Sequence, residues 1–154
     1  MPERNKFVNT FKTVTHLRDK NRIRSIGVSN FEPEHLKMLI DATGIVPAVN
    51  QVELHPRLPQ SELREVHAQL GIATEAWGPL GQGSLLTHPT ITAVAEGCGK
   101  TPAQVLISWR IRVGNIVIPK SVNLSGLRAT SRCSTSNSTM RRHRSPPRWN
   151  TTWS

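Results

Sequence analysis

The chain has 154 residues and a formal net charge of +10, with two cysteines and no tyrosine, and its length suits one domain of modest size or a part of a larger one. Two cysteines exclude a disulfide framework and a four-cysteine zinc site and indicate a reducing compartment, so we expect a cytoplasmic protein. No apolar run approaches the roughly 20 residues that span a bilayer, and residues 1–12 are too polar for a secretory signal, so we expect no membrane partner.

Two hydrophobic periods alternate along the chain up to about residue 122. In chain order, they predict a helix at Phe7–Arg18, a strand at Ile23–Val28, a helix at Glu32–Ala42, a strand at Ala48–Leu54, a helix at Ser61–Leu70, a strand at Ile72–Trp77, a loop at Gly78–His88, a helix at Ala103–Val113 and a strand at Asn115–Pro119. Gly44 and Gly71 are helix stops, and Thr101 to Gln104 is a capping box. The alternation predicts an α/β fold with a parallel sheet, either a doubly wound four-stranded sheet or half of an eight-stranded barrel.

In both arrangements the ligand site lies at the carboxyl ends of the strands. Small and polar groups follow the predicted strands there: Ser29-Asn30, Gln51, Trp77, the loop Gly81-Gln82-Gly83, and Lys120-Ser121. Neutral amides and hydroxyls suit a carboxamide or a sugar, an indole offers a flat face for stacking, and the backbone N–H groups of a glycine loop can approach a pyrophosphate. Each feature alone is better explained by a helix cap, core packing or a turn, but together they favour a ligand of nucleotide size.

Other constellations in the sequence are weaker. Glu53 and His55 alternate along one predicted strand and so share a face, but no third group completes an acid–base arrangement. The histidines lack the spacing of metal ligands, so no metal site is predicted. Gly99-Lys100-Thr101 ends like a phosphate-binding loop, but it follows a helix and lacks the required earlier glycine.

Four motifs follow one another along the chain. Arg24–Phe31 reads RSIGVSNF, Asn50–Pro56 reads NQVELHP, Trp77–Gly83 reads WGPLGQG, and Val117–Val122 contains IPKS. In this order and at these separations they resemble the motifs of the aldo-keto reductases, most closely the prokaryotic branch that contains diketogluconate reductases, over residues 1–123. The resemblance implies an (α/β)8 TIM barrel, here present as about strands five to eight, with NADP(H) as the cofactor and reduction of small-molecule aldehydes or ketones by hydride transfer.

The same motifs imply a role at the cofactor for each matching residue. Ser29, Asn30 and Gln51 would hold the nicotinamide carboxamide, and Trp77 would stack on the ring. The pyrophosphate passage would be lined by Leu80, Gly81 and Gln82, and the adenosine 2′-phosphate side would be met by Lys120, Ser121, Val122 and Asn123. Gly78 stands where the family usually has serine, so one hydroxyl contact to the cofactor is lost.

The resemblance also implies that the catalytic residues are missing. The family's catalytic Asp, Tyr, Lys and His come from the first four strands, whereas Met1 aligns just after them and the chain contains no tyrosine. We therefore expect residues 1–122 to be a partial barrel, the cofactor-binding half, inactive alone, with Met1 an internal methionine that serves as a start. Half a barrel leaves two unpaired strand edges, which favours self-association.

The composition changes at about residue 123. Residues 123–154 contain six arginines, no lysine and no acidic residue, and their apolar residues follow no clear period, which predicts a disordered basic tail. Codons can be chosen that encode the tail and that, when they are read from the third base of the Asn123 codon, encode the sequence with which the family normally continues. We therefore interpret the tail as a shifted reading frame, which the DNA sequence around this codon tests. The alternative is a non-catalytic protein whose tail, through Arg141–Arg148, Trp149 and Trp153, binds RNA or another polyanion; a shifted frame makes a nucleic-acid partner the weaker interpretation.

Overall fold

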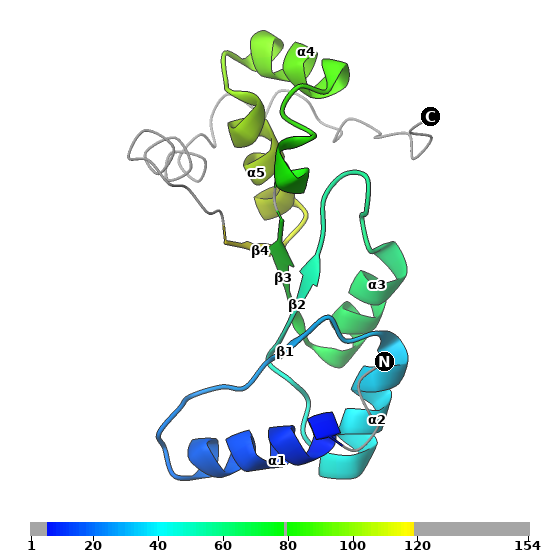
Figure 1. The fold of residues 1–154 in the computed structure, drawn as a ribbon, viewed down its shortest axis with the longest axis vertical. Coiled ribbons are helices and arrows are strands. Elements are labelled where there is room, and N and C mark those ends of the chain that lie inside the picture. The colour runs from blue at the N-terminus through cyan, green and yellow to red at the C-terminus, as the bar shows by residue number, and fades with distance from the viewer. Residues whose placement is uncertain (1–5, 79, 119–154) are drawn as a thin grey trace. The chain divides into compact units, whose positions relative to one another are not determined.

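The computed structural model describes residues 6–78 and 80–118 (Figure 1). Its elements are α1 (Lys6–Asp19), β1 (Val28–Ser29), α2 (Pro33–Thr43), β2 (Val49–Glu53), α3 (Ser61–Leu70), β3 (Ala73–Trp77), the short 3-10 helix η1 (Gly81–Gly83), α4 (Pro89–Cys98), α5 (Pro102–Arg112) and β4 (Ile116–Val117). The predicted tail at 123–154 and Pro119, the last residue of the predicted fourth strand, lie outside the described residues.

Strands and helices alternate as the hydrophobic pattern predicts. The strands form one four-stranded sheet in the order β1-β2-β3-β4. β1 and β2 pair in parallel, with Val28 opposite Asn50 and Ser29 opposite Gln51. A doubly wound sheet reverses its strand order at a switch point, and this sheet has no reversal. The strand order therefore favours the second arrangement, a segment of a barrel.

Helix ends follow local sequence signals closely. α3 has the predicted bounds, and α2 and α3 both end at a glycine in the left-handed region, Gly44 at φ 69° and Gly71 at φ 70°. The predicted capping box opens α5, because the Gln104 N–H donates to Thr101 Oγ1 at 3.3 Å and the Thr101 N–H donates to Gln104 Oε1 at 3.0 Å. α4 occupies the stretch between the predicted loop and this capping box.

The first strand is shorter than predicted and begins later, at Val28 rather than Ile23. β1 is the first strand in the sheet order and pairs with β2 alone. Upstream of the two paired residues, the Ala48 N–H donates to the Ile26 carbonyl at 2.8 Å. Ile23 and Ile26 instead contribute to a hydrophobic core with α1 and α2. Their apolar character therefore reflects core packing and not strand pairing.

The chain divides into two compact units. Unit 1 comprises the residues up to Val52 and Gln60–Glu75, and unit 2 comprises Glu53–Pro59 and the residues from Ala76 onward. In unit 1, the side chains of Val8, Phe11, Ile26 and Leu39 form a buried cluster. Phe31 packs beside this cluster with its ring edge-to-face against Phe7 at 5.1 Å between centroids. This packing joins the segment after β1 to the helices of unit 1.

In unit 2, α4 and α5 pack around a second core. Leu85, Ile91 and Leu106 are buried there, and Leu80 and Leu86 pack against them. Arg110, one turn beyond Leu106 on α5, is also fully buried. Residues four apart share a helix face, so α5 buries a charged side chain on the same face as Leu106.

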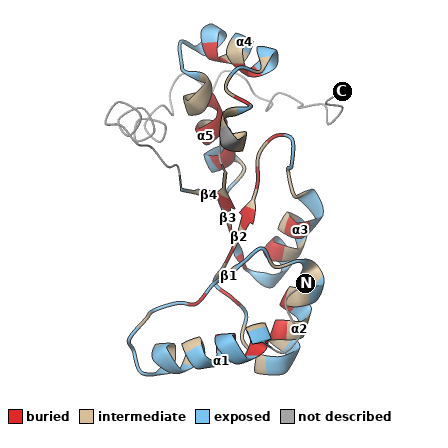
Figure 2. Ribbon diagram, viewed as in Figure 1, coloured by how far each residue is buried: buried red, intermediate tan, exposed pale blue. Residues whose placement is uncertain are grey.

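Burial alternates along β2 and β3, as the red and tan residues in Figure 2 show. Asn50, Val52, Thr74 and Ala76 are buried, whereas Gln51, Glu53, Glu75 and Trp77 are half-buried. Successive side chains of a strand point to opposite faces. Gln51 and Trp77, two of the predicted cofactor residues, therefore lie on the less buried face of their strands.

Candidate functional site

Three of the predicted site residues come together where β1 ends. Ser29 lies opposite Gln51 in the β1–β2 register. The Ser29 hydroxyl donates to the backbone carbonyl of Gln51 at 3.1 Å, and the Asn30 N–H donates to the same backbone carbonyl at 2.8 Å. The structure thus brings Ser29, Asn30 and Gln51 together at the carboxyl end of the first strand pair.

Asn30 makes the turn out of the strand. Its φ of 55° lies in the left-handed region, which asparagine tolerates better than most residues other than glycine. The chain then enters α2, which has Pro33 at its start. Ser29 and Asn30 therefore lie at the strand end, and Phe31, the next residue, packs against the core of unit 1.

Gln51 is held by a residue that the sequence interpretation did not single out. Its Nε2 donates to the Glu75 Oε1 at 2.5 Å. A carboxylate acceptor makes this a strong, orienting hydrogen bond. The signal that could have found Glu75 is the period of two along β3, which places it on the same strand face as Trp77.

The other described site residues belong to unit 2. Trp77 is the half-buried last residue of β3. Leu80 packs against the core of unit 2, and Gly81 has φ 55°, with space so limited that a Cβ there would lie 2.9 Å from the Leu85 side chain. Gln82 lies within η1, and its side chain is outside the described atoms. Ser29 and Gln51, by contrast, belong to unit 1.

The glycine loop uses its backbone donors internally. The Gly81 N–H donates to the Gly78 carbonyl at 2.9 Å, and the Gly83 N–H donates to the Leu80 carbonyl at 3.0 Å. The sequence suggested that N–H groups of this loop approach a pyrophosphate. In the structure these two N–H groups instead form hydrogen bonds within the turns of η1. They are therefore already paired and are not free to bind a pyrophosphate.

The remaining predicted contacts are at the far end of the cofactor. Lys120, Ser121, Val122 and Asn123 lie outside the described residues. Their role at the 2′-phosphate stays a prediction from the sequence.

Glu53 and His55 lie close to each other, with the His55 Nε2 3.5 Å from the Glu53 Oε1. Burial lowers the pKa of His55; Glu53 opposes this shift and Arg110 adds to it. Arg110 is therefore a second charged group near enough to act on His55, which the sequence did not predict. Burial favours the neutral form of His55.

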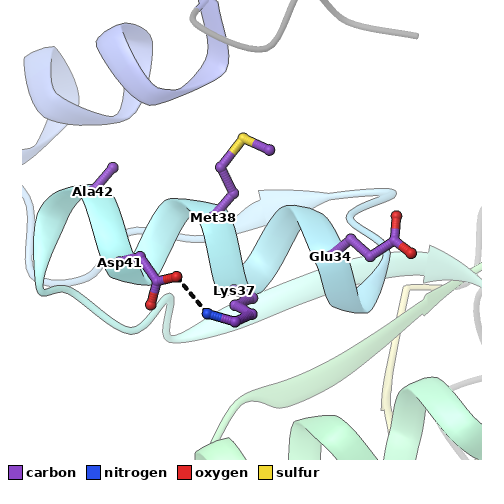
Figure 3. A pocket seen from close by; sticks show the side chains of 5 residues that line it. All are labelled: Glu34, Lys37, Met38, Asp41 and Ala42. Carbon is purple, nitrogen blue, oxygen red and sulfur yellow. Dashed lines mark hydrogen bonds and ion pairs between the residues drawn. The ribbon is translucent and has the colours of Figure 1, made fainter.

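A shallow hollow lies along one side of α2 (Figure 3). Its lining side chains are Glu34, Lys37, Met38, Asp41 and Ala42, and Lys37 Nζ and Asp41 Oδ2 form an ion pair one turn apart at 2.6 Å. None of the predicted cofactor residues lines it. The hollow is a feature of one exposed helix face and adds nothing to the site.

Within residues 6–78 and 80–118, acidic, histidine and cysteine side chains form no group of three suited to a metal ion. Over the same ranges, no helix combines the length and apolar character needed to cross a membrane.

The parallel strand pair, the unreversed strand order and the polar strand ends define a βα-repeat protein of the barrel type. The chain belongs to the aldo/keto reductase family, whose sequence profile matches residues 2–139. Over 123 residues it is 76% identical to an aldo-keto reductase of Mycolicibacterium smegmatis, a match that covers 80% of this chain and 45% of that protein. An aldo-keto reductase of Mycobacterium avium is 48% identical over 120 residues, which are 78% of this chain and 42% of that protein.

Solved structures give the same family. A crystal structure of a Gox0644 variant in complex with NADPH has 48% sequence identity and a TM-score of 0.84, covering 87% of this chain and 49% of that one. An aldo/keto reductase from Brucella melitensis has 44% identity and a TM-score of 0.81, covering 85% of this chain and 50% of that one. The family and the barrel fold that the motifs implied are confirmed, and the chain spans about half the length of the relatives it matches.

Proposed function

We propose that this chain is the NADP(H)-holding half of an aldo-keto reductase that reduces small aldehydes or ketones. The observation that carries the proposal is the cluster at the end of β1, where the Gln51 carbonyl accepts from both the Ser29 hydroxyl and the Asn30 N–H. The structural similarity to Gox0644, which was solved with NADPH, supports the choice of cofactor.

The chemistry of the cluster fits a nicotinamide carboxamide. That group has one carbonyl acceptor and one NH2 donor, and it is uncharged, so neutral hydroxyl and amide side chains match it. Gln51 donates one Nε2 proton to Glu75, which leaves its Oε1 and its second Nε2 proton for the carboxamide. Glu75 would thus orient the Gln51 amide.

The rest of the cofactor would extend along the residues that match the family's motifs. Trp77 would stack on the nicotinamide ring, and Leu80, Gly81 and Gln82 would shape the pyrophosphate passage. Lys120, Ser121, Val122 and Asn123 would meet the 2′-phosphate. The cofactor, when bound, would supply the hydride, and these residues would bind and orient it.

We further propose that the 154 residues do not reduce a carbonyl by themselves. The family's proton donor is a tyrosine, and this sequence has none. NADPH-dependent turnover of an aldehyde by the purified chain would contradict this part of the proposal without touching the binding part.

The binding part is tested by NADPH titration of the purified chain and two variants. Gln51→Leu removes the amide, and we expect it to weaken NADPH binding by about 2–10-fold, the range for one net hydrogen bond. Gln69→Leu makes the same change at an exposed position of α3 and should leave the Kd unchanged. Absence of NADPH binding by the unmodified chain, or equal weakening in both variants, would overturn the proposal. Salt-sensitive RNA binding that is lost on removing residues 124–154 would instead support the basic-tail alternative.

A further inference from the structure

A line of three buried polar side chains runs through unit 1, on the opposite strand face from Gln51. Thr74 of β3, His67 of α3 and Asn50 of β2 are 8%, 1% and 0% exposed. The His67 Nδ1 lies 2.8 Å from the Thr74 Oγ1, and the His67 Nε2 lies 3.0 Å from the Asn50 Nδ2. Polar groups buried this deeply are stable only when their hydrogen-bonding atoms are paired.

The line ends on the backbone next to the cofactor cluster. The Asn50 Nδ2 donates to the Phe31 carbonyl at 2.7 Å, and the Phe31 N–H donates to the Asn50 Oδ1 at 3.3 Å. One side chain thus binds both backbone groups of the residue that directly follows Ser29-Asn30. Together with the Asn30 N–H bond to the Gln51 carbonyl, this fixes the turn at two successive residues.

The hydrogen bonds determine where the protons lie. Asn50 Oδ1 accepts from Phe31, so Nδ2 has two protons, one for the Phe31 carbonyl and one for the His67 Nε2. The Nε2 must then be an acceptor, and the imidazole proton sits on Nδ1 and is donated to the Thr74 hydroxyl. Protonation of Nε2 would place two donors against each other. The pKa of His67 is lowered by burial alone, so this neutral form is favoured.

We propose that Asn50, His67 and Thr74 are positioning residues for the cofactor-binding turn: neutral His67, fixed by Thr74, orients the Asn50 amide, which holds Phe31 and thereby Ser29 and Asn30. The cofactor part of this inference rests on the proposed function. Thr74 is the informative member, because its hydroxyl bonds His67 and does not touch the turn itself.

The first measurement needs no variant. Imidazole ¹⁵N shifts of the labelled full chain should show His67 protonated on Nδ1 and unprotonated on Nε2. An Nε2–H tautomer would overturn the inference.

The second measurement follows amide hydrogen exchange in Thr74→Val, which keeps the shape but removes the hydroxyl. We expect exchange at the Phe31 N–H to rise about 2–10-fold more than at the Phe11 N–H in α1, because one hydrogen bond of the line is lost. Thr74→Ser should restore the original exchange, and Thr15→Val, which makes the same change on α1, should not single out Phe31. Equal acceleration at Phe31 and Phe11 in Thr74→Val would mean a merely structural role and would overturn the inference.

The third measurement is NADPH affinity, which should fall in Thr74→Val and recover in Thr74→Ser. Unchanged affinity in Thr74→Val would overturn the link from the line to the cofactor. If the unmodified chain does not bind NADPH, the proposed function fails, and the exchange measurement still decides whether the line positions the turn.

Discussion

Arg110 is the most unusual single residue in the described part of the chain. Its side chain is fully buried, and among the described residues no group accepts a hydrogen bond from its Nε, Nη1 or Nη2. Burial lowers its pKa to about 10, so it still carries a charge at neutral pH. A buried cation without a partner reduces the free energy of unfolding, because its hydration is lost and nothing replaces it.

Replacing this cation with an apolar side chain of similar length should stabilise the protein. We expect Arg110→Met to raise the free energy of unfolding by about 1–4 kcal/mol, the range seen when buried ionic groups are replaced by well-packed apolar ones. Urea denaturation measures it. Arg112→Met, at an exposed position of the same helix, should change stability by less than about 0.5 kcal/mol. Destabilisation by Arg110→Met would show that the guanidinium has a partner in solution.

At the scale of elements, the helices α1, α2, α3 and α5 were predictable because their signals are local, whereas α4 (Pro89–Cys98) was not given a predicted range. The capping box at Thr101 begins α5, and the left-handed glycines Gly44 and Gly71 end α2 and α3. Each signal lies within or directly beside its helix. Strand lengths were less predictable, because pairing depends on residues more than twenty positions away. β1 has two paired residues, although six apolar-rich positions from Ile23 predicted a longer strand.

The candidate site divides in the same way. Ser29, Asn30 and Gln51 were predictable from motifs at strand ends, because parallel strands end at one edge of a sheet. Two hydrogen-bonded pairs could not be predicted in this way. Gln51 and Glu75 are 24 positions apart, and Asn50 and Phe31 are 19 positions apart. Such pairs depend on strand register and side-chain direction, which periodicity alone does not fix.

The pairing of β1 with β2 depends on a glycine. An alanine Cβ at Gly27 would lie 2.3 Å from the Val49 Cγ1 and 2.9 Å from the Val49 carbonyl oxygen. We therefore expect Gly27→Ala to reduce the free energy of unfolding by about 1–3 kcal/mol, as overpacking does. Gly97→Ala is the matched control, because nothing lies within 4 Å of its Cβ position in α4; it should raise stability by about 0.5–1 kcal/mol. Thermal unfolding distinguishes them, and equal effects of the two changes would contradict the close approach of β1 and β2.

At the scale of the molecule, the four strands that the structure describes leave one strand at each end of the sheet. β1 and β4 are first and last in the strand order, and the chain covers 45% of its Mycolicibacterium relative. Ile116 of β4 and the following Ile118 are 47% and 52% exposed. The unpaired N–H and C=O groups of an edge strand are a template for pairing with another chain, and exposed apolar side chains beside the edge favour such a contact. Two such sheets contain the eight strands of the family's barrel.

We therefore expect the purified chain to form dimers in which β4 of one copy meets β1 of the other. Light scattering after size-exclusion chromatography measures the molar mass. Ile118→Lys should shift the equilibrium toward the monomer, because a charge at an edge opposes pairing. Leu17→Lys, which replaces a similarly exposed leucine on α1, should not. A monomer at every concentration, or an equal shift in both variants, would contradict edge-to-edge association.

The strand register also has a consequence for folding kinetics. Ser29 meets Gln51 across 22 positions, and Gln51 meets Glu75 across 24. The first three strands therefore find their neighbours by closing loops of nearly the same length, whereas β4 at Ile116–Val117 follows β3 only after α4 and α5. The nascent chain can pair β1, β2 and β3 in turn as each βα unit leaves the ribosome, and we expect the pairing of β4, which closes the longest loop, to come last.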